Sequence, residues 1–170
     1  PYNKTFDSGA FHFVEDGNGK IYRTSNSKDL TIYDALGKNH GTVTFDKGFV
    51  LSSNIGICEL LTKYMDPSIY KEYLDKFGFL KPVNAPFLNN EGGSMSFNYA
   101  SEKLSTGFGQ AISINALQMV QAYSAIFNDG KIVLPFVVDR IENTNGKIIK
   151  QYDTTITGQP FSEKTSKYMQ

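Results

Sequence analysis

Tryptophan is absent from this sequence, and cysteine and histidine are scarce, with one Cys and two His among 170 residues. The lone Cys58 excludes a disulfide framework within the chain, and its place in an apolar run predicts a buried, unreactive thiol. His12 and His40 have no second ligand at metal-binding spacing, so the sequence predicts no metal site. The glycine-rich pieces lack the Lys-Ser/Thr of a phosphate loop, and we expect no cofactor.

An excess of charge and a long hydrophobic run are also missing. Seventeen basic residues balance seventeen acidic ones, which argues against a nucleic acid partner because binding to phosphates needs a basic surplus. No apolar run approaches the roughly 20 residues of a membrane-spanning helix, so we expect any anchor or export signal outside this chain. What is present is a globular composition, 40% hydrophobic and 14% aromatic, which can form a packed core.

The predicted elements of the first half change from strands to helices. Short strands and loops are expected over the first fifty residues, with turns at glycine and asparagine. Helical periodicity begins near Thr44, breaks at residues 52–54 and resumes over residues 54–64. The clearest helix follows over residues 66–78, where Asp66-Pro67 is a favourable start and a glycine ends the helix. Its last apolar position, Phe77, is expected to be buried.

The second half predicts a loop, a helix and a hairpin. Residues 81–105 read as an irregular exposed loop, and residues 115–127 as a helix. Asn145-Gly146 predicts the turn of a hairpin between residues 132–141 and 147–152, whose partner strands are expected outside this chain because one hairpin makes no stable sheet. Ser162-Glu163 begins a last helix. The apolar face predicted for the helix over 115–127 comprises Leu117, Met119, Val120, Tyr123 and Ile126.

Ser52-Ser53-Asn54 is the candidate site of the sequence. By itself Ser-x-Asn is most often a helix cap. Its surroundings, residues 41–56, resemble the segment around the second motif of class B penicillin-binding proteins, the division-type peptidoglycan D,D-transpeptidases. The stretches that continue the resemblance, in the family's order, are residues 6–9, 31–34, 73–79, 106–113, 117–131 and 161–165. The departures from the family's pattern are Ala35 and His40, where tryptophans are common, Ala111 for glycine and Asn115-Ala116 for Thr-Pro.

The resemblance implies roles for individual residues. Such enzymes use three motifs: Ser-x-x-Lys for nucleophile and base, Ser-x-Asn, and Lys-Thr-Gly on a strand. Ser52 would relay a proton to the leaving amine, and Asn54 would hold the lysine and the substrate's backbone carbonyl. Ser53 would face away and pack. The stretch that would bind substrate at the mouth of the cleft, matching the family's Phe-Gly-Gln, comprises Phe108, Gly109 and Gln110.

Two stretches imitate the other motifs. Residues 25–28, Ser-Asn-Ser-Lys, fit Ser-x-x-Lys literally, but glycine and asparagine surround them and no long buried helix follows. The reaction needs both side chains one helical turn apart, so we do not assign Ser25 as the nucleophile. Residues 105–107, Ser-Thr-Gly, lack the cation of Lys-Thr-Gly. We therefore expect the nucleophile upstream of this chain and Lys-Thr-Gly downstream.

The resemblance also implies the character of the whole protein. The fold would be α/β (α+β), with helices covering an antiparallel sheet, and residues 1–170 would be part of a transpeptidase domain, mostly its helical half plus a hairpin. The full-length enzyme would cross-link peptidoglycan stem peptides through a serine acyl-enzyme, and β-lactam antibiotics would acylate it. It would act on the outer face of the bacterial cytoplasmic membrane with other cell-wall synthesis or division proteins. This chain alone would be inactive.

Two other functions remain open at this point. A serine β-lactamase or β-lactam sensor would share the fold, but a lactamase needs a water-activating base, and the sequence identifies none. A non-enzymatic wall-binding domain would use Ser-Ser-Asn only as a cap and its exposed tyrosines as a binding surface. Hydrolysis of an acyl-enzyme within seconds would favour the lactamase, and wall binding independent of Ser52 would favour the binding domain.

Overall fold

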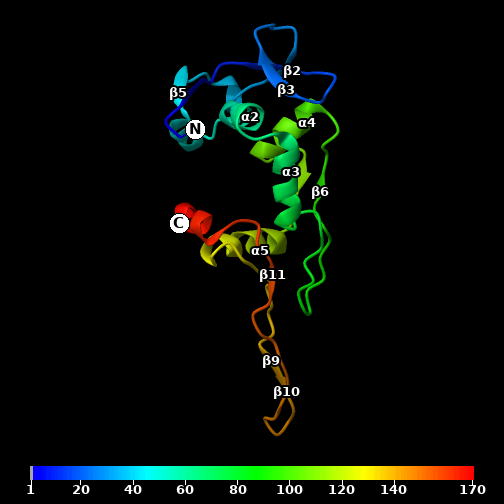
Figure 1. Ribbon diagram of the computed structural model, residues 1–170. Helices are drawn as coiled ribbons and strands as arrows, with labels where there is room; N and C mark the ends of the chain where they lie inside the picture. Colours follow the sequence, from blue (N-terminus) through cyan, green and yellow to red (C-terminus); the bar gives the residue numbers. More distant parts are fainter. Residues whose placement is uncertain (1) are drawn as a thin grey trace. The chain divides into compact units, whose positions relative to one another are not determined.

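The computed structural model describes residues 2–170, which form two compact units (Figure 1). The first unit comprises residues 2–70 and 95–112, and the second comprises residues 71–94 and 113–170. The division falls within helix α3 and within the paired strands β6 and β7. Both units contain helices and strands, as predicted for a mixed α and β fold. The bounds of these three elements are Pro67–Lys76, Ser94–Met95 and Ile112–Ser113.

Short antiparallel strands form one side of the first unit. Strand β2 lies between β3 and β4, and a separate pair joins β1 to β5. Because successive side chains of a strand point to opposite faces, Phe11 and Phe13 of β2 both enter the core, where they are almost inaccessible to solvent. The strands and loops predicted for the first fifty residues are thus confirmed. The strands are β1 (Thr5–Asp7), β2 (Phe11–Glu15), β3 (Ile21–Thr24), β4 (Leu30–Ile32) and β5 (Thr42–Thr44).

Helices α1 (Phe45–Val50) and α2 (Asn54–Lys63) form the other side of this unit, and α2 contacts β3 (Figure 1). Both helices and the break between them are confirmed. Ile55, Cys58 and Leu61 of α2 are buried against the phenylalanines of the strands. Burial raises the pKa of the Cys58 thiol, in agreement with the inert cysteine expected from its sequence position.

Helix α4 (Ala100–Ser105) corrects the prediction of an irregular loop over residues 81–105. The Glu102 carboxylate accepts hydrogen bonds from the amides of Asn98 and Tyr99, which otherwise have no partner at a helix start. Leu104 is completely buried in the core of the first unit. A turn of 3-10 helix, η2 (Thr106–Phe108), follows directly.

Helix α3 begins as the sequence predicts. The Asp66 carboxylate accepts hydrogen bonds from the hydroxyl and the amide of Ser68, and these bonds lower the pKa of Asp66. The predicted burial of Phe77 is wrong. Leu74 is the buried residue near the end of the helix, whereas Phe77 is half-buried and its ring lies 5.7 Å from that of Phe79 and 5.8 Å from that of Phe161.

Helix α5 (Ala116–Phe127) is confirmed, but three of the five residues of its predicted apolar face are exposed, while Leu117 and Ile126 are partly buried. Met119, Val120 and Tyr123 are 39%, 59% and 54% exposed. The buried positions are instead Gln118, Ala122 and Ala125. Two of these buried positions are small alanines, and the Gln118 amide is tolerated inside because it donates to the Lys81 carbonyl at 2.8 Å.

The hairpin and the last helix complete the second unit. The predicted hairpin forms around the Asn143–Gly146 turn from β9 and β10, while Ile132, predicted to lie in the same strand as β9, belongs to β8 and pairs with β11. Ser162 caps α6 by accepting from the Thr165 amide, as its position predicts. These elements are β8 (Ile132–Val133), β9 (Arg140–Glu142), β10 (Ile148–Gln151), β11 (Ile156–Gly158) and α6 (Glu163–Met169).

Candidate functional site

Ser52 forms the turn between helices α1 and α2. Its amide donates to the Phe49 carbonyl at 3.0 Å, and the amide of Ser53 donates to the Gly48 carbonyl at 2.9 Å, which together make a Schellman helix end. That arrangement needs a left-handed residue, usually glycine, and Ser52 has φ 54°. Ser52 is exposed, and within residues 2–170 its hydroxyl has no hydrogen-bond partner. The hydroxyl is therefore open to a ligand.

Ser53 begins the next helix instead of facing solvent. It is 4% exposed, and its hydroxyl accepts a hydrogen bond from the Gly56 amide at 3.0 Å, which caps α2. Ser53 was predicted to face away and pack, and its burial confirms that it is packed. The capping interpretation of the tripeptide thus applies to Ser53, while the side chain of Ser52 takes no part in the cap.

Asn54 is the first residue of α2, and its side chain is held at one end only. Its Nδ2 donates to the Tyr33 carbonyl at 3.0 Å, whereas its carbonyl oxygen makes no hydrogen bond within the described residues. Asn54 is half-buried, which fixes the amide beside the exposed Ser52. The predicted pair of site residues therefore lies at one helix junction with two polar groups available.

Asp34 completes this junction, and sequence analysis predicted no role for it beyond its match to the family. Its carboxylate is buried at 5% exposure and accepts hydrogen bonds from the Ser53 hydroxyl and from the Ile55 amide. Burying a carboxylate is costly unless it is hydrogen-bonded, and the carboxylate of Asp34 has its hydrogen bonds from these two groups. No local pattern marks it, because its partners lie about 20 positions away along the chain.

Two glycines allow α1 and α2 to meet over one aromatic ring. A Cβ at Gly48 would come within 2.6 Å of the Phe6 ring, and a Cβ at Gly56 within 2.9 Å. Phe6 is buried and packs on Phe45 with ring centroids 5.0 Å apart. The residues on both sides of Ser-Ser-Asn are therefore packed against the same side chain, which fixes the angle of the turn between them.

The Phe108-Gly109-Gln110 stretch belongs to the same unit as the Ser-Ser-Asn junction. Phe108 is partly buried against the core cluster that contains Ile55, whereas Gly109 and Gln110 are exposed. Gly107 permits this approach, because a Cβ there would lie 2.7 Å from side-chain atoms of Ile57 on α2. The stretch is thus held against α2, the helix that begins with Asn54.

Neither of the two imitating stretches has the structure of a catalytic motif. Residues 25–28 form an exposed turn between β3 and β4, so Ser25 and Lys28 are not on a helix. Thr106 of the Ser-Thr-Gly stretch is buried in η2, and its hydroxyl donates to the Lys103 carbonyl. Both were set aside on sequence grounds, and their structures agree.

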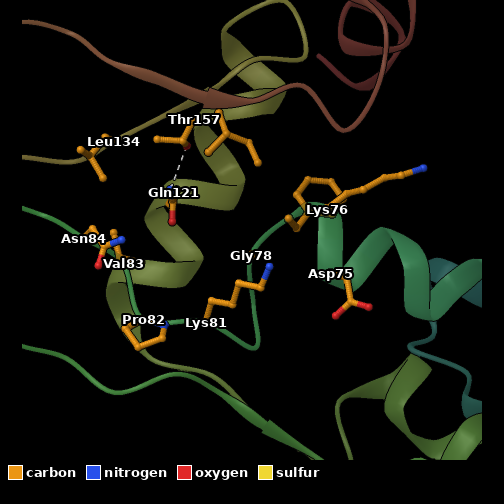
Figure 2. Close-up of a pocket in the computed structure, with 12 residues that line it drawn as sticks. Asp75, Lys76, Gly78, Lys81, Pro82, Val83, Asn84, Gln121, Leu134 and Thr157 are labelled. Atoms are coloured by element: carbon orange, nitrogen blue, oxygen red, sulfur yellow. Dashed lines mark hydrogen bonds between the residues drawn. The ribbon is translucent and has the colours of Figure 1, made fainter.

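A separate pocket lies within the second unit (Figure 2). It has a volume of about 340 Å³, and Gln121 on its wall donates to the Thr157 hydroxyl at 3.1 Å. Lys81 extends into the labelled group of side chains in Figure 2. Since all its lining residues belong to the second unit, this pocket does not include Ser52 or Asn54. Among residues 2–170, no group of three or more acidic, histidine or cysteine side chains could hold a metal ion.

The sequence is similar to known proteins along nearly its whole length. The family described as "Penicillin binding protein transpeptidase domain" matches residues 5–170. "Stage V sporulation protein D" of Bacillus subtilis (strain 168) is 30% identical over 133 residues, covering 75% of this chain and 20% of that protein. A "Peptidoglycan D,D-transpeptidase FtsI homolog" of Mesostigma viride is 26% identical over 123 residues, covering 66% and 20%. The chain spans about a fifth of the length of these relatives.

Solved structures share the fold. Penicillin binding protein 2X from Streptococcus thermophilus matches with a TM-score of 0.79 at 24% identity, over 99% of this chain and 23% of that chain. Penicillin binding protein 3 from Mycobacterium tuberculosis, complexed with aztreonam, matches with a TM-score of 0.75 at 22% identity, over 99% and 35%. The predicted α/β fold and the predicted family are both confirmed. The chain belongs to the penicillin-binding protein transpeptidase domain family.

Proposed function

We propose that the full-length protein is a serine-type D,D-transpeptidase that cross-links peptidoglycan stem peptides and is acylated by β-lactams. The observation that carries the proposal is the junction at Ser52, where an exposed hydroxyl without a hydrogen-bond partner among the described residues stands beside the fixed amide of Asn54. A serine that served only as a cap would instead have its hydroxyl on the helix amides, as Ser53 has.

In the proposed chemistry this chain supplies Ser-x-Asn, and the other two motifs are expected on either side of it. A serine hydroxyl is a weak nucleophile until a base removes its proton, and a lysine of lowered pKa in Ser-x-x-Lys would be that base. Ser52 would pass a proton to the leaving amine of the donor stem peptide. Asn54, with its carbonyl oxygen available, would hold the lysine, and its amide would orient the substrate's backbone carbonyl.

Phe108, Gly109 and Gln110 would contact the substrate at the edge of the cleft. In support of this role, Gly109 and Gln110 are exposed while Phe108 anchors the stretch on the core of the first unit. Gly109 has φ 82°, a conformation that favours glycine and lets the backbone turn sharply after η2. An exposed backbone on a rigid anchor is suited to binding an extended peptide.

The proposed setting follows from the kinds of protein to which this chain is similar. One is a peptidoglycan D,D-transpeptidase FtsI homolog and another a sporulation protein, which supports the division-type subgroup of cell-wall enzymes. We place the enzyme on the outer face of the bacterial cytoplasmic membrane, with other cell-wall synthesis or division proteins as partners. None of the helices in residues 2–170 is long and apolar enough to cross a membrane.

The experiment that tests the proposal compares three variants of the full-length protein. Ser52→Ala and Asn54→Ala are expected to lower the second-order rate of acylation by a β-lactam, by about 10²–10⁴-fold for a proton-transferring group. Ser25→Ala, an exposed serine in a turn, is the matched control and should react like the wild type. Mass spectrometry of the acylated protein measures the rate, and thermal unfolding verifies that each variant folds.

The outcomes distinguish the proposal from its alternatives. Normal acylation of Ser52→Ala and Asn54→Ala, with a lowered melting temperature, would mean that the junction is only structural. A wild type that releases the acyl group within seconds would be a β-lactamase. A wild type that binds cell walls and never reacts would be a wall-binding domain.

A further inference from the structure

We propose that Asp34 is a positioning residue for the Ser52–Asn54 junction, an inference that rests on the proposed function. Asp34 does not touch the substrate in this proposal. It acts through the residues on which the orientation of Ser52 and Asn54 depends. Its carboxylate is one of two buried carboxylates in the described part of the first unit, and it lies at the start of α2.

The contacts of the carboxylate involve both of its oxygens. Oδ1 and Oδ2 each lie 3.0 Å from the Ser53 hydroxyl, which donates, and Oδ1 also accepts from the Ile55 amide at 3.1 Å. The Ser53 hydroxyl at the same time accepts from the Gly56 amide at 3.0 Å. Asp34 therefore binds the first turn of α2 both directly and through Ser53.

The start of α2 is also a favourable location for the carboxylate of Asp34. The amides at the start of a helix have no partners within the helix, and its dipole favours a negative charge there. Helix α2 has ten residues, and none of the residues in its first turn is acidic. A carboxylate supplied by a distant segment takes the place of the missing acidic residue, and hydrogen bonds to an ionised acceptor are among the stronger ones.

The segment around Asp34 is itself held in place. The Asp34 carbonyl accepts from the Gly37 amide at 2.9 Å, which closes the η1 turn (Ala35–Gly37). The preceding carbonyl, that of Tyr33, accepts from the Asn54 side chain at 3.0 Å. Two consecutive residues of one turn thus hold two consecutive residues of the motif, Ser53 by its hydroxyl and Asn54 by its amide.

Within the described part of the chain, the side chain of Ser52 has no comparable hydrogen bond of its own. Its place is set by the helix end before it and by Ser53 after it, and its backbone is in the left-handed region that L side chains rarely adopt. If Ser53 loses its hydrogen bonds to the Asp34 carboxylate, the residue that follows Ser52 is held less firmly. The direction of the Ser52 hydroxyl is then no longer fixed from the α2 side. A displacement of about 1 Å in a catalytic group can cost about 10²-fold in rate.

Glu59 provides a matched control for the loss of a buried carboxylate. It is 1% exposed, lies on the same helix, and pairs with Arg23 at 2.7 Å and Lys63 at 2.6 Å. Among the described residues, it makes no hydrogen bond or ion pair with the Ser52–Asn54 turn. Glu59→Gln therefore removes an equally buried charge from the same unit without removing a contact of the motif.

The experiment measures acylation rate and melting temperature on the full-length protein. Asp34→Asn retains size and one oxygen acceptor, and we expect it to lower the second-order acylation rate by about 10–100-fold. Glu59→Gln should lower the melting temperature and leave the acylation rate of the folded protein unchanged. Ser53→Ala removes the partner and is expected to slow acylation too, so the prediction stays testable if Asp34→Asn fails to fold.

The double variant Asp34→Asn/Ser53→Ala provides the decisive comparison. If both residues act through their shared hydrogen bond, the double variant should be little slower than either single variant. Wild-type acylation by Asp34→Asn, or an equal loss of rate in Glu59→Gln, would overturn the positioning role alone. A wild type that does not react with β-lactams at all would overturn the proposed function, and the positioning role with it.

Discussion

At the scale of single residues, the three members of Ser-Ser-Asn have three different structural positions. Ser52 follows the end of α1, Ser53 caps α2, and Asn54 is the first residue of α2. The helix cap that a short serine and asparagine motif usually indicates is present, but it uses only the middle residue. The two outer residues keep polar groups available, so capping and chemistry are both compatible with one tripeptide.

Ser52→Gly separates the effect of the backbone conformation at this position from the effect of the hydroxyl. A left-handed conformation costs an L residue about 1–2 kcal/mol and costs glycine nothing, while the unfolded glycine chain gains about 0.5–1 kcal/mol of entropy. Since Ser52 has φ 54°, we expect Ser52→Gly to be at least as stable as the wild type. Thermal unfolding of the full-length protein measures this, and Ser52→Ala, which keeps the strain, is the control.

The same variant should lose acylation, because the hydroxyl is gone. A gain in stability with a loss of reactivity is the opposite of what a purely structural serine would give. If Ser52→Gly reacts with a β-lactam as fast as the wild type, the proton relay assigned to Ser52 is wrong. If it unfolds at a clearly lower temperature than Ser52→Ala, the helix end described above is wrong.

Residue identity indicated the candidate site only in part. Ser52 and Asn54 could be proposed from the sequence because they lie close together in it and their surroundings match a family. Asp34 lies 19 positions before Ser53, and one aspartate before an alanine resembles any turn residue. Its role depends on a long-range hydrogen bond between two buried groups, and such a bond leaves no periodicity in the sequence from which to predict it.

At the scale of elements, helix starts were predictable where the cap is a local pattern. Asp66-Pro67 and Ser162 both lie where a capping residue was expected. Helix α4 was missed because its cap is atypical: the N-cap position is Tyr99, and Glu102 supplies the hydrogen bonds. A six-residue helix also has too few turns for its apolar spacing to stand out.

Helix faces were harder to predict than helix positions. For α5 the pattern selected the large apolar residues, but the buried apolar positions are small ones, Ala122 and Ala125. Gln118 is buried because its side chain finds partners at Lys81 and Asn115. Hydrophobic periodicity indicates which apolar side chains avoid water. It does not indicate where a small residue is buried, or where a buried polar side chain finds hydrogen-bond partners.

The corrected face of α3 gives a stability prediction. Leu74→Ala removes a side chain that is 6% exposed and should cost about 2–5 kcal/mol. Phe77→Ala should cost less than Leu74→Ala, although phenylalanine is the larger residue, because Phe77 is half-buried whereas Leu74 is buried. The melting temperatures of the two full-length variants give the order, and a larger loss for Phe77→Ala would restore the face first predicted.

At the scale of the whole molecule, the chain carries the one of the three proposed catalytic motifs that contains Ser52 and Asn54. It spans about a fifth of the length of its curated relatives and 23–35% of the two solved chains described above. The Ser-x-Asn junction is built from segments that all lie in the first unit, which explains why it has a defined geometry within these 170 residues. A nucleophile and a cation for the substrate carboxylate are what it would still need.

The 170-residue chain by itself should therefore form no covalent adduct with penicillin. Two stretches fit Ser-x-x-Lys. Residues 25–28 form an exposed turn in which Ser25 and Lys28 are not one helical turn apart. Residues 68–71 lie on α3, but the Ser68 hydroxyl donates to the Asp66 carboxylate and Lys71 pairs with Asp75, so in neither stretch is a lysine placed to deprotonate the serine. Mass spectrometry after incubation with a reactive β-lactam measures this, once circular dichroism has verified that the chain is helical. The full-length protein under the same conditions is the positive control and should gain the mass of one β-lactam. An adduct located at Ser25 of the short chain would falsify this assignment, because the nucleophile would then lie within these residues.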